Sequence, residues 1–381
     1  MTASAFSFRT VPHIHAGAGA ARQLARLAAP LIGSRKRVFL VTDQGVRKAG
    51  LIDAATASLE EAGLQVEIYD RVVADPPKSV VLEAEDKARG FGAEVVLGLG
   101  GGSSMDTAKV VALLLGSSQT LDDMYGVNNA TGPRLPLILI PTTAGTGSEV
   151  TPISVLTVGE STKMGINAPA LYADLAVLDA ELTYGLPRAV TAATGIDAMV
   201  HAIEAYTSKI EKNPVSDALA LAGLKKLHGA IETACRDGSD RQAREDMLLG
   251  ALLAGQAFAN APVGAVHALA YPLGGVFHVP HGLSNSLMLP PVLRYNASAA
   301  EPLYAELASH LGLHASTDGL VTEMERIADS VGIETRLTQV GVSHNDLPRL
   351  AEEAMEVKRL LVNNPREMTL EAAQACYEAV L

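Results

Sequence analysis

Short apolar runs alternate with helical patterns between about Arg35 and Leu178. The apolar runs, rich in β-branched residues, cover residues 37–42, 65–69, 94–99, 137–141 and 175–179. Between them, residues 46–63 and 79–89 carry apolar positions at helical spacing. Strands that alternate with helices are typical of βαβ units, so we predict a largely parallel sheet.

The pattern changes after Pro187, where the β-rich runs disappear. The remaining chain is rich in Ala, Leu, Glu and Met. Its helical patterns begin at Thr191, Pro214, Arg241, Glu301, Thr317, Leu347 and Thr369. We therefore predict an α/β domain over residues 1–187 and an all-helical domain over residues 188–381.

Composition narrows the class of protein. The 381 residues are 48% hydrophobic, but no apolar run approaches the roughly 18 residues of a membrane helix. A net charge of −12 argues against a nucleic-acid partner and against an anionic membrane surface. The N-terminus lacks a signal-peptide pattern, and Cys235 and Cys376 match no metal or redox spacing. We expect a cytoplasmic globular protein.

Four residues suggest a metal site. Asp197 and His201 have an i, i+4 spacing, which places both side chains on one face of a helix. His267 and His281 are separated by a segment that we expect to break any single helix and to turn the second histidine back towards the first; its turn residues are Pro272, Gly274, Gly275 and Pro280. One carboxylate and three imidazoles suit a single divalent cation such as Fe, Zn, Co, Ni or Mn. The alternative is a helix-capping Asp197 with three structural histidines.

A glycine-rich turn suggests an anion site. Residues 94–109 read as strand, tight turn and helix, and Gly100, Gly101 and Gly102 permit close approach to the backbone. Ser103 and Ser104 open the helix, whose free N–H groups favour a pyrophosphate. The pattern is neither a P-loop nor a GxGxxG fingerprint, and an ordinary βα turn is the alternative. A second small-residue loop, residues 141–151, also follows a strand directly.

The four segments together closely resemble the iron-containing alcohol dehydrogenase family. They read GGGSSMDTAK (100–109), PTTAGTGSEVT (141–151), TGIDAMVHAIEAY (194–206) and HALAYPLGG (267–275) followed by PHG (280–282). The resemblance runs from about Phe8 to the C-terminus. It implies an N-terminal α/β dinucleotide-binding domain and an all-helical C-terminal domain, as in dehydroquinate synthase, with the active site in the cleft between them. It also implies NAD, Fe²⁺ or possibly Zn²⁺, a small alcohol or aldehyde substrate, and a homodimer or larger homo-oligomer.

The resemblance also assigns site residues. It implies metal ligands at Asp197, His201, His267 and His281. It implies cofactor contacts at Gly100, Gly101, Gly102, Ser103, Asp106, Thr142, Thr143, Thr146 and Lys163.

One position departs from the family pattern. Many members carry a second histidine four residues after the third ligand, where this chain has Tyr271. A tyrosine, with a pKa of about 10, is a poor base near neutral pH. We therefore expect Tyr271 to line the substrate side of the nicotinamide pocket, and we consider His278 as a stand-in for the missing proton relay.

Asp43 predicts the cofactor preference. It ends the strand over residues 37–42, where its carboxylate can accept hydrogen bonds from the adenosine ribose and repel a 2′-phosphate. We expect NAD to be preferred over NADP, although Asp43 can instead serve only as a helix cap.

Other functions stay open at this point. A maleylacetate-reductase-like or hydroxyacid–oxoacid-transhydrogenase-like enzyme would share the fold; the first needs no metal, and the complete ligand set counts against it. A dehydroquinate-synthase-like lyase would need a basic cluster for a phosphorylated substrate, whereas Ala, Leu, Gly and Val flank the ligands here. A non-enzymatic binding protein would have no reason to keep both sites.

Overall fold

The computed structural model describes residues 5–159 and 162–381 of the chain. Two compact units are present. One, the α/β unit, comprises residues 10–143 and 147–184. The other, the helical unit, comprises the chain through Arg9, residues 144–146 and residues 185–381.

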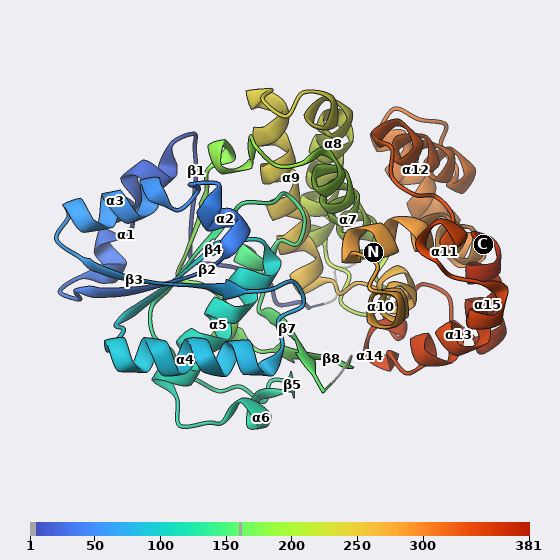
Figure 1. Ribbon diagram of the computed structural model, residues 1–381. Coiled ribbons are helices and arrows are strands. Elements are labelled where there is room, and N and C mark those ends of the chain that lie inside the picture. The colour runs from blue at the N-terminus through green and yellow to red at the C-terminus, as the bar shows by residue number, and fades with distance from the viewer. Residues whose placement is uncertain (1–4, 160–161) are drawn as a thin grey trace. The chain divides into compact units, whose positions relative to one another are not determined.

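The α/β unit is built on a parallel sheet, as predicted (Figure 1). Its strands have the order β1-β9-β6-β4-β2-β3, and all of the recorded pairings are parallel. Their bounds are β1 (His13–Ala16), β2 (Arg37–Asp43), β3 (Gln65–Val72), β4 (Val95–Gly100), β6 (Leu137–Pro141) and β9 (Leu175–Leu178). The central strands are buried on both faces, which explains why they read as continuous apolar runs.

Helices cover the two faces of this sheet. Helices α1 (Leu24–Ile32) and α3 (Asp53–Glu61) contribute to one core with residues of β2, β4 and β6. Helices α4 (Lys78–Phe91) and α5 (Gly102–Gly116) pack together against the other face. The unit also holds α2 (Gln44–Lys48), α6 (Leu121–Met124) and the 3₁₀ turns η1 (Ala20–Gln23), η2 (Ser148–Val150), η3 (Pro169–Leu171) and η4 (Ala180–Thr183).

Two features of this unit differ from the prediction. The helix expected over residues 46–63 is two helices, α2 and α3, because Gly50 has a left-handed backbone (φ 72°) that ends the first. A second sheet with the order β5-β8-β7 was not expected. Its strands are β5 (Gly126–Val127), β7 (Ile153–Val158) and β8 (Thr162–Asn167), and β7 and β8 pair antiparallel.

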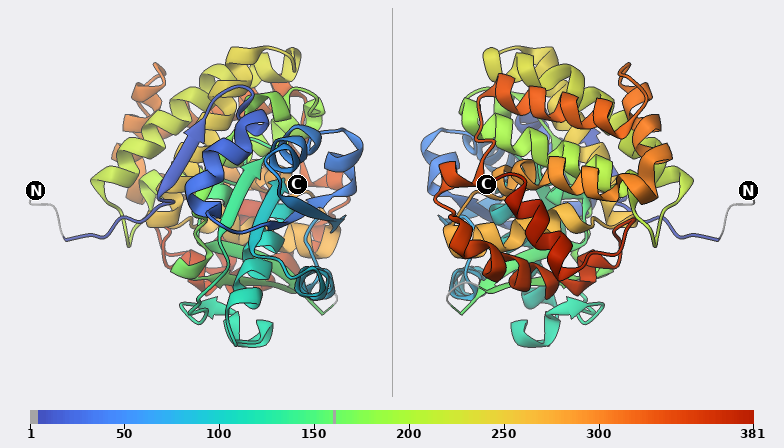
Figure 2. Two further views of the ribbon diagram at one scale, coloured as in Figure 1. Left: turned by 90° about the vertical axis from the view of Figure 1, so that its left-hand side faces the viewer. Right: turned by 90° about the vertical axis from the view of Figure 1, so that its right-hand side faces the viewer.

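The helical unit surrounds a buried helix, α7 (Arg188–Thr207), in agreement with the all-helical prediction. Helix α7 packs against α8 (Pro214–Arg236), α9 (Arg241–Asn260), α11 (His281–His310) and α12 (Thr317–Val331), and Figure 2 shows these helices from two opposite sides. The remaining helices are α10 (Ala265–Phe277), α13 (Leu347–Met355), α14 (Lys358–Leu361) and α15 (Leu370–Glu378), with the 3₁₀ turns η5 (Leu337–Val340) and η6 (His344–Asp346).

Prolines misled the sequence analysis in this unit. Helix α11 begins at His281 rather than at Glu301 and contains Pro290, Pro291 and Pro302. Helix α10 runs through Pro272, Gly274 and Gly275, which were expected to break it, and ends at Phe277. In both helices extensive burial of apolar side chains outweighs the lost backbone hydrogen bonds.

Hydropathy was also evaluated for each described helix. None of them is, by itself, long and apolar enough to cross a membrane, whereas α9 and α10, which meet at 106°, pass this test only as a bent pair.

Candidate metal centre and cofactor loops

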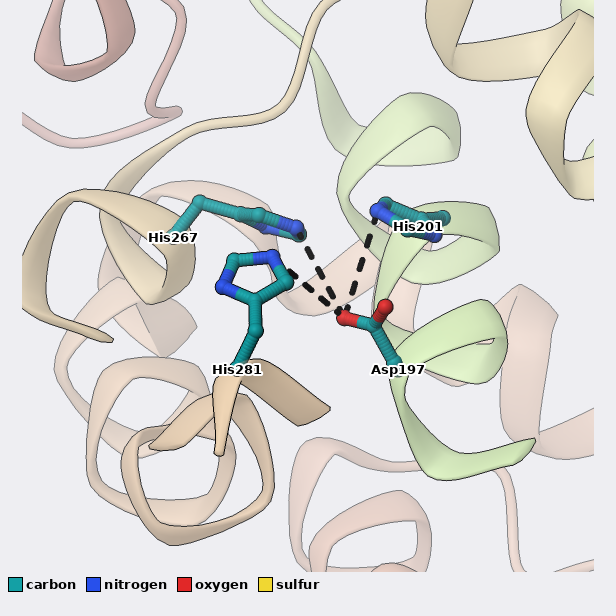
Figure 3. A group of neighbouring side chains, drawn as sticks. All are labelled: Asp197, His201, His267 and His281. Carbon is teal, nitrogen blue, oxygen red and sulfur yellow. Dashed lines mark ion pairs between the residues drawn. The ribbon is translucent and has the colours of Figure 1, made fainter. Parts of the chain in front are cut away.

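Helix α7 supplies the first two residues of the metal centre. Asp197 and His201 lie one helical turn apart on the same face, and both side chains are buried (Figure 3). The His201 ring stacks on Phe258 of α9, with 4.3 Å between the ring centres, so its orientation is fixed by packing. The sequence prediction that Asp197 and His201 share one face is therefore confirmed.

The break between α10 and α11 supplies the other two. After Phe277, His278 adopts a left-handed backbone (φ 55°), and Pro280 precedes the first turn of α11. This turn brings the His281 ring to 5.3 Å from the His267 ring, between ring centres. The expectation that the second histidine folds back is correct, although the break involves His278 and Pro280 rather than Pro272.

Gly282 allows α11 to approach α7. A Cβ atom at this position would lie 2.2 Å from the Ala193 carbonyl oxygen and 3.3 Å from the Asp197 Cβ. Any larger residue would therefore push the start of α11, and His281 with it, away from Asp197. The glycine after His281 is a requirement of the metal centre.

The ligand atoms converge on one point. The Nε2 atoms of the three histidines lie 4.0, 4.0 and 3.8 Å from Asp197 Oδ1, for His201, His267 and His281 respectively (Figure 3). All four ligand atoms lie within 4.8 Å of one another. Ligands about 2.1 Å from one cation can be at most about 4.2 Å apart, so small side-chain rotations complete the set.

Protonation in this site suits a cation. Burial opposes ionisation of Asp197, but the three histidines and Asn285 outweigh it and lower the pKa of the carboxyl below its usual range. Burial lowers the pKa of the His201 imidazole to about 3, so this ring is neutral near pH 7. An ionised carboxylate and neutral imidazoles are the forms that bind metals, and the residues therefore fit a divalent cation.

Glu204 orients one ligand from behind. Its carboxylate accepts a hydrogen bond from His267 Nδ1 at 2.6 Å and another from the Val266 backbone N–H at 2.8 Å. The proton on Nδ1 leaves the Nε2 lone pair of His267 directed into the ligand set. Such a carboxylate–histidine pair raises the basicity of the ligand and fixes its ring.

Asn285 is a second supporting residue. Its Nδ2 donates to Asp197 Oδ1 at 2.6 Å and lies 3.1 and 3.2 Å from the Nε2 atoms of His267 and His281. The amide is buried, and it bridges three of the four ligand atoms. The sequence analysis missed Glu204 and Asn285, but both were detectable: each is a polar residue three or four positions after a ligand histidine on an apolar helix.

The cofactor candidates lie at the carboxyl ends of β2 and β4. The chain leaves β2 towards β3 through α2 and α3, and leaves β4 in the opposite direction through α5. The gap between such strands is where doubly wound sheets bind ligands. At this point Asp43 Oδ2 lies 3.5 Å from Ser104 Oγ, so the strand end and the glycine-rich turn are adjacent.

The glycine-rich turn has an open face. Helix α5 begins at Gly102, with Gly101 as its N-cap, so Gly102 and Ser103 lie in the first turn, where backbone N–H groups have no helical acceptor. A Cβ atom at Gly101 would meet nothing nearer than the Thr143 side chain at 3.8 Å. Gly100 accepts a hydrogen bond from the Thr142 N–H at 3.0 Å. The turn has the form of a cradle for a pyrophosphate.

Several candidates have other partners in this structure. Asp43 caps α2 through the Val46 N–H at 3.0 Å. The Asp106 carboxylate accepts hydrogen bonds from Ser148 and from the Val155 N–H, and Lys163 forms an ion pair with Asp75 at 2.6 Å. Direct cofactor contacts of these residues, and of Thr146, which lies in the helical unit, stay predictions.

Tyr271 and His278 occupy different surroundings. The Tyr271 ring lies 6.0 Å from the His281 ring, between ring centres, so it borders the metal centre. His281 is the open side of that centre, with 44% of its side chain exposed, whereas the other three ligands are buried. His278 is exposed at the end of α10, and the described residues include no recorded side-chain partner for it.

Comparison with known proteins agrees with this geometry. Residues 12–180 match the family model described as iron-containing alcohol dehydrogenase, and residues 191–381 match that of the C-terminal region of the Fe-containing alcohol dehydrogenase family. The fold and the four-ligand cluster define an enzyme of the metal- and dinucleotide-dependent type. The chain belongs to the iron-containing alcohol dehydrogenase family.

Three similar proteins illustrate the range of this family. Long-chain-alcohol dehydrogenase 1 of Geobacillus thermodenitrificans is 41% identical, over 97% of this chain and 95% of its own length. Sulfoacetaldehyde reductase of Bilophila wadsworthia is 38% identical, over 98% of this chain and 99% of its own. The crystal structure of sulfoacetaldehyde reductase from Bifidobacterium kashiwanohense in complex with NAD⁺ is 26% identical, with a TM-score of 0.91, and covers 99% of each chain.

Proposed function

We propose that the protein is a metal-dependent oxidoreductase that interconverts an alcohol and an aldehyde or ketone by hydride transfer to and from NAD. The convergence of Asp197, His201, His267 and His281 on one point carries this proposal. The NAD⁺ complex of the Bifidobacterium relative supports the choice of cofactor. Fe²⁺ is the family's metal, and the ligand set also suits Zn²⁺.

The side chains of the helical unit have defined tasks. Asp197 and the three histidines would hold the cation, Glu204 fixes the His267 ring, and Asn285 fixes the Asp197 carboxylate. A divalent cation in this position supplies Lewis-acid polarisation of the substrate oxygen. Because the protein supplies the charge stabilisation in this way, a strong side-chain base is less necessary, and a tyrosine at position 271 is compatible with the chemistry.

The α/β unit would hold the cofactor. The first turn of α5 and Gly101 would bind its pyrophosphate, and Asp43 would accept from the adenosine ribose. The bound nicotinamide supplies the hydride acceptor or donor. A homodimer or larger homo-oligomer and a cytoplasmic location stay predictions from the sequence.

The test is a substrate panel with matched cofactors. Metal-loaded protein is given primary alcohols, diols and the corresponding aldehydes, with NAD⁺ or NADH, and absorbance of the reduced cofactor is followed. The proposal predicts reversible turnover of at least one alcohol–aldehyde pair and no turnover by chelator-treated protein. Absence of cofactor turnover across the panel by fully metal-loaded protein would contradict it.

A further inference from the structure

An arginine lies beside the open side of the metal centre. Arg359, in the short helix α14, donates from Nη2 to the Tyr271 hydroxyl at 3.2 Å, and its guanidinium carbon lies 5.7 Å from the centre of that ring. The same ring lies 6.0 Å from the ring of His281, the exposed ligand. Tyr271 therefore connects the accessible edge of the ligand set to a guanidinium group.

The guanidinium of Arg359 retains free hydrogen-bonding capacity. It carries five N–H donors, of which one is used on Tyr271. In the part of the chain that the structure describes, no carboxylate lies within 4.0 Å of it. Arg326, in contrast, is engaged by both Glu232 and Glu323. Arg359 is also exposed, so an incoming anion can reach it without displacing a protein partner.

Its neighbours do not compete for the same role. Lys358 is also exposed, but its ammonium group pairs with Glu356 at 3.5 Å. Arg359 is thus the cation that the fold holds against Tyr271, and its planar fork suits the paired oxygens of a carboxylate or sulfonate. A point charge such as lysine would lack this two-point geometry.

We infer that Arg359 forms a subsite for the anionic end of a short-chain aldehyde or alcohol whose reacting oxygen is held at the Asp197–histidine centre. The inference rests on the proposed function and names its substrate class: small oxo or hydroxy acids with a carboxylate or sulfonate. The separations of 6.0 and 5.7 Å from His281 to Tyr271 and from Tyr271 to Arg359 favour a short chain. Tyr271 positions the guanidinium through its hydroxyl.

The test compares two probes of similar length that differ in charge: 4-oxobutanoate and its methyl ester. Metal-loaded protein is assayed with NADH. We expect wild-type kcat/KM to favour the anion, and Arg359→Gln to lower kcat/KM for the anion by about tenfold or more, which corresponds to one charge-assisted contact. The ester should change by less than about threefold. Arg359→Lys should recover part of the loss for the anion.

A matched variant controls for structural effects. Arg366 also lies against a tyrosine, with its guanidinium carbon 4.0 Å from the Tyr295 ring centre. Arg366→Gln therefore removes an equivalent arginine–tyrosine contact and should leave the ratio of the two probes unchanged. As a readout without turnover, binding of 4-hydroxybutanoate to metal-loaded protein lacking NAD is measured by calorimetry, and Arg359→Gln should weaken it by a similar factor.

Two results would overturn the subsite. The first is equal or better use of the ester by the wild type. The second is an Arg359→Gln variant that loses activity on both probes equally and melts at lower temperature, which would make Arg359 an anchor of α14. Failure of the proposed function has a different signature, since metal-loaded protein would then reduce neither probe nor any neutral aldehyde.

Discussion

Glu204→Gln tests how the protein prepares a metal ligand. In the wild type the two carboxylate oxygens accept from two donors, the Val266 N–H and His267 Nδ1. A glutamine has one acceptor oxygen and one NH₂ group, so it cannot accept from both. If its oxygen keeps the Val266 N–H, its NH₂ faces His267 Nδ1 and favours the tautomer with the proton on Nε2. That proton occupies the lone pair that the metal needs.

The expected loss is in metal affinity. Substitution of a residue that supports a ligand typically weakens metal binding by about 10- to 100-fold, which is about 1.4–2.7 kcal/mol. We expect a Kd increase of this size for Zn²⁺ or Fe²⁺, measured by competition with a chromogenic chelator, and a kcat close to that of the wild type once metal is saturating. The two effects separate ligand preparation from chemistry.

Glu306→Gln is the matched control. Glu306 also accepts a 2.6 Å hydrogen bond, from the Tyr206 hydroxyl, but it touches none of the metal ligands in the recorded contacts. It should leave the Kd for metal unchanged. A Glu204→Gln protein that bound metal as tightly as the wild type would refute the reasoning and reduce Glu204 to an anchor for the start of α10.

Three further predictions follow from individual side chains. Asp43→Asn keeps the cap on α2 but removes the charge, so the ratio of kcat/KM for NADP to that for NAD should rise about tenfold from a wild-type preference for NAD; a wild type that prefers NADP would contradict this. Tyr271→Phe should keep most of kcat for a good substrate and change the ranking among alcohols in a steady-state panel, whereas a loss of several orders of magnitude on every substrate would place the hydroxyl in the chemistry. Burial raises the pKa of the Glu149 carboxyl to about 7, against its own backbone N–H and Lys109, so its stabilising protonated form is present below the unfolded value near pH 4.5 and is lost as pH rises through 7. Glu149→Gln should therefore raise the urea midpoint more at pH 8 than at pH 5.5, and parallel stability profiles would be the contrary result.

The sequence predicted the central sheet well, for a physical reason. Strands β2, β4 and β6 are buried on both faces, so each appears as an uninterrupted apolar run. Strand β1 is an edge strand with largely exposed residues, and β7 and β8 mix exposed and buried positions. Nothing in such sequences separates them from loops, and they were missed.

The helical unit shows the opposite failure. The prolines in α10 and α11 favoured breaks on local grounds, but burial of neighbouring side chains kept both helices continuous. The ligand set itself was accessible from the sequence, because i, i+4 spacing is a local property. The roles of Glu204 and Asn285 depend on contacts across 63 and 88 residues of sequence, and only the fold reveals them.

The central claim is that hydride transfer depends on one cation held by Asp197 and the three histidines. The most direct measurement is a stepwise titration of chelator-treated protein with Fe²⁺ or Zn²⁺, recording bound metal per chain and the initial rate of NAD reduction with an alcohol substrate. We predict that activity rises in proportion to bound metal and saturates at one ion per chain, and that His281→Ala, which alters the most exposed ligand, loses metal and activity together while His310→Ala loses neither. Full activity in metal-free wild-type protein, or in His281→Ala without bound metal, would contradict the account.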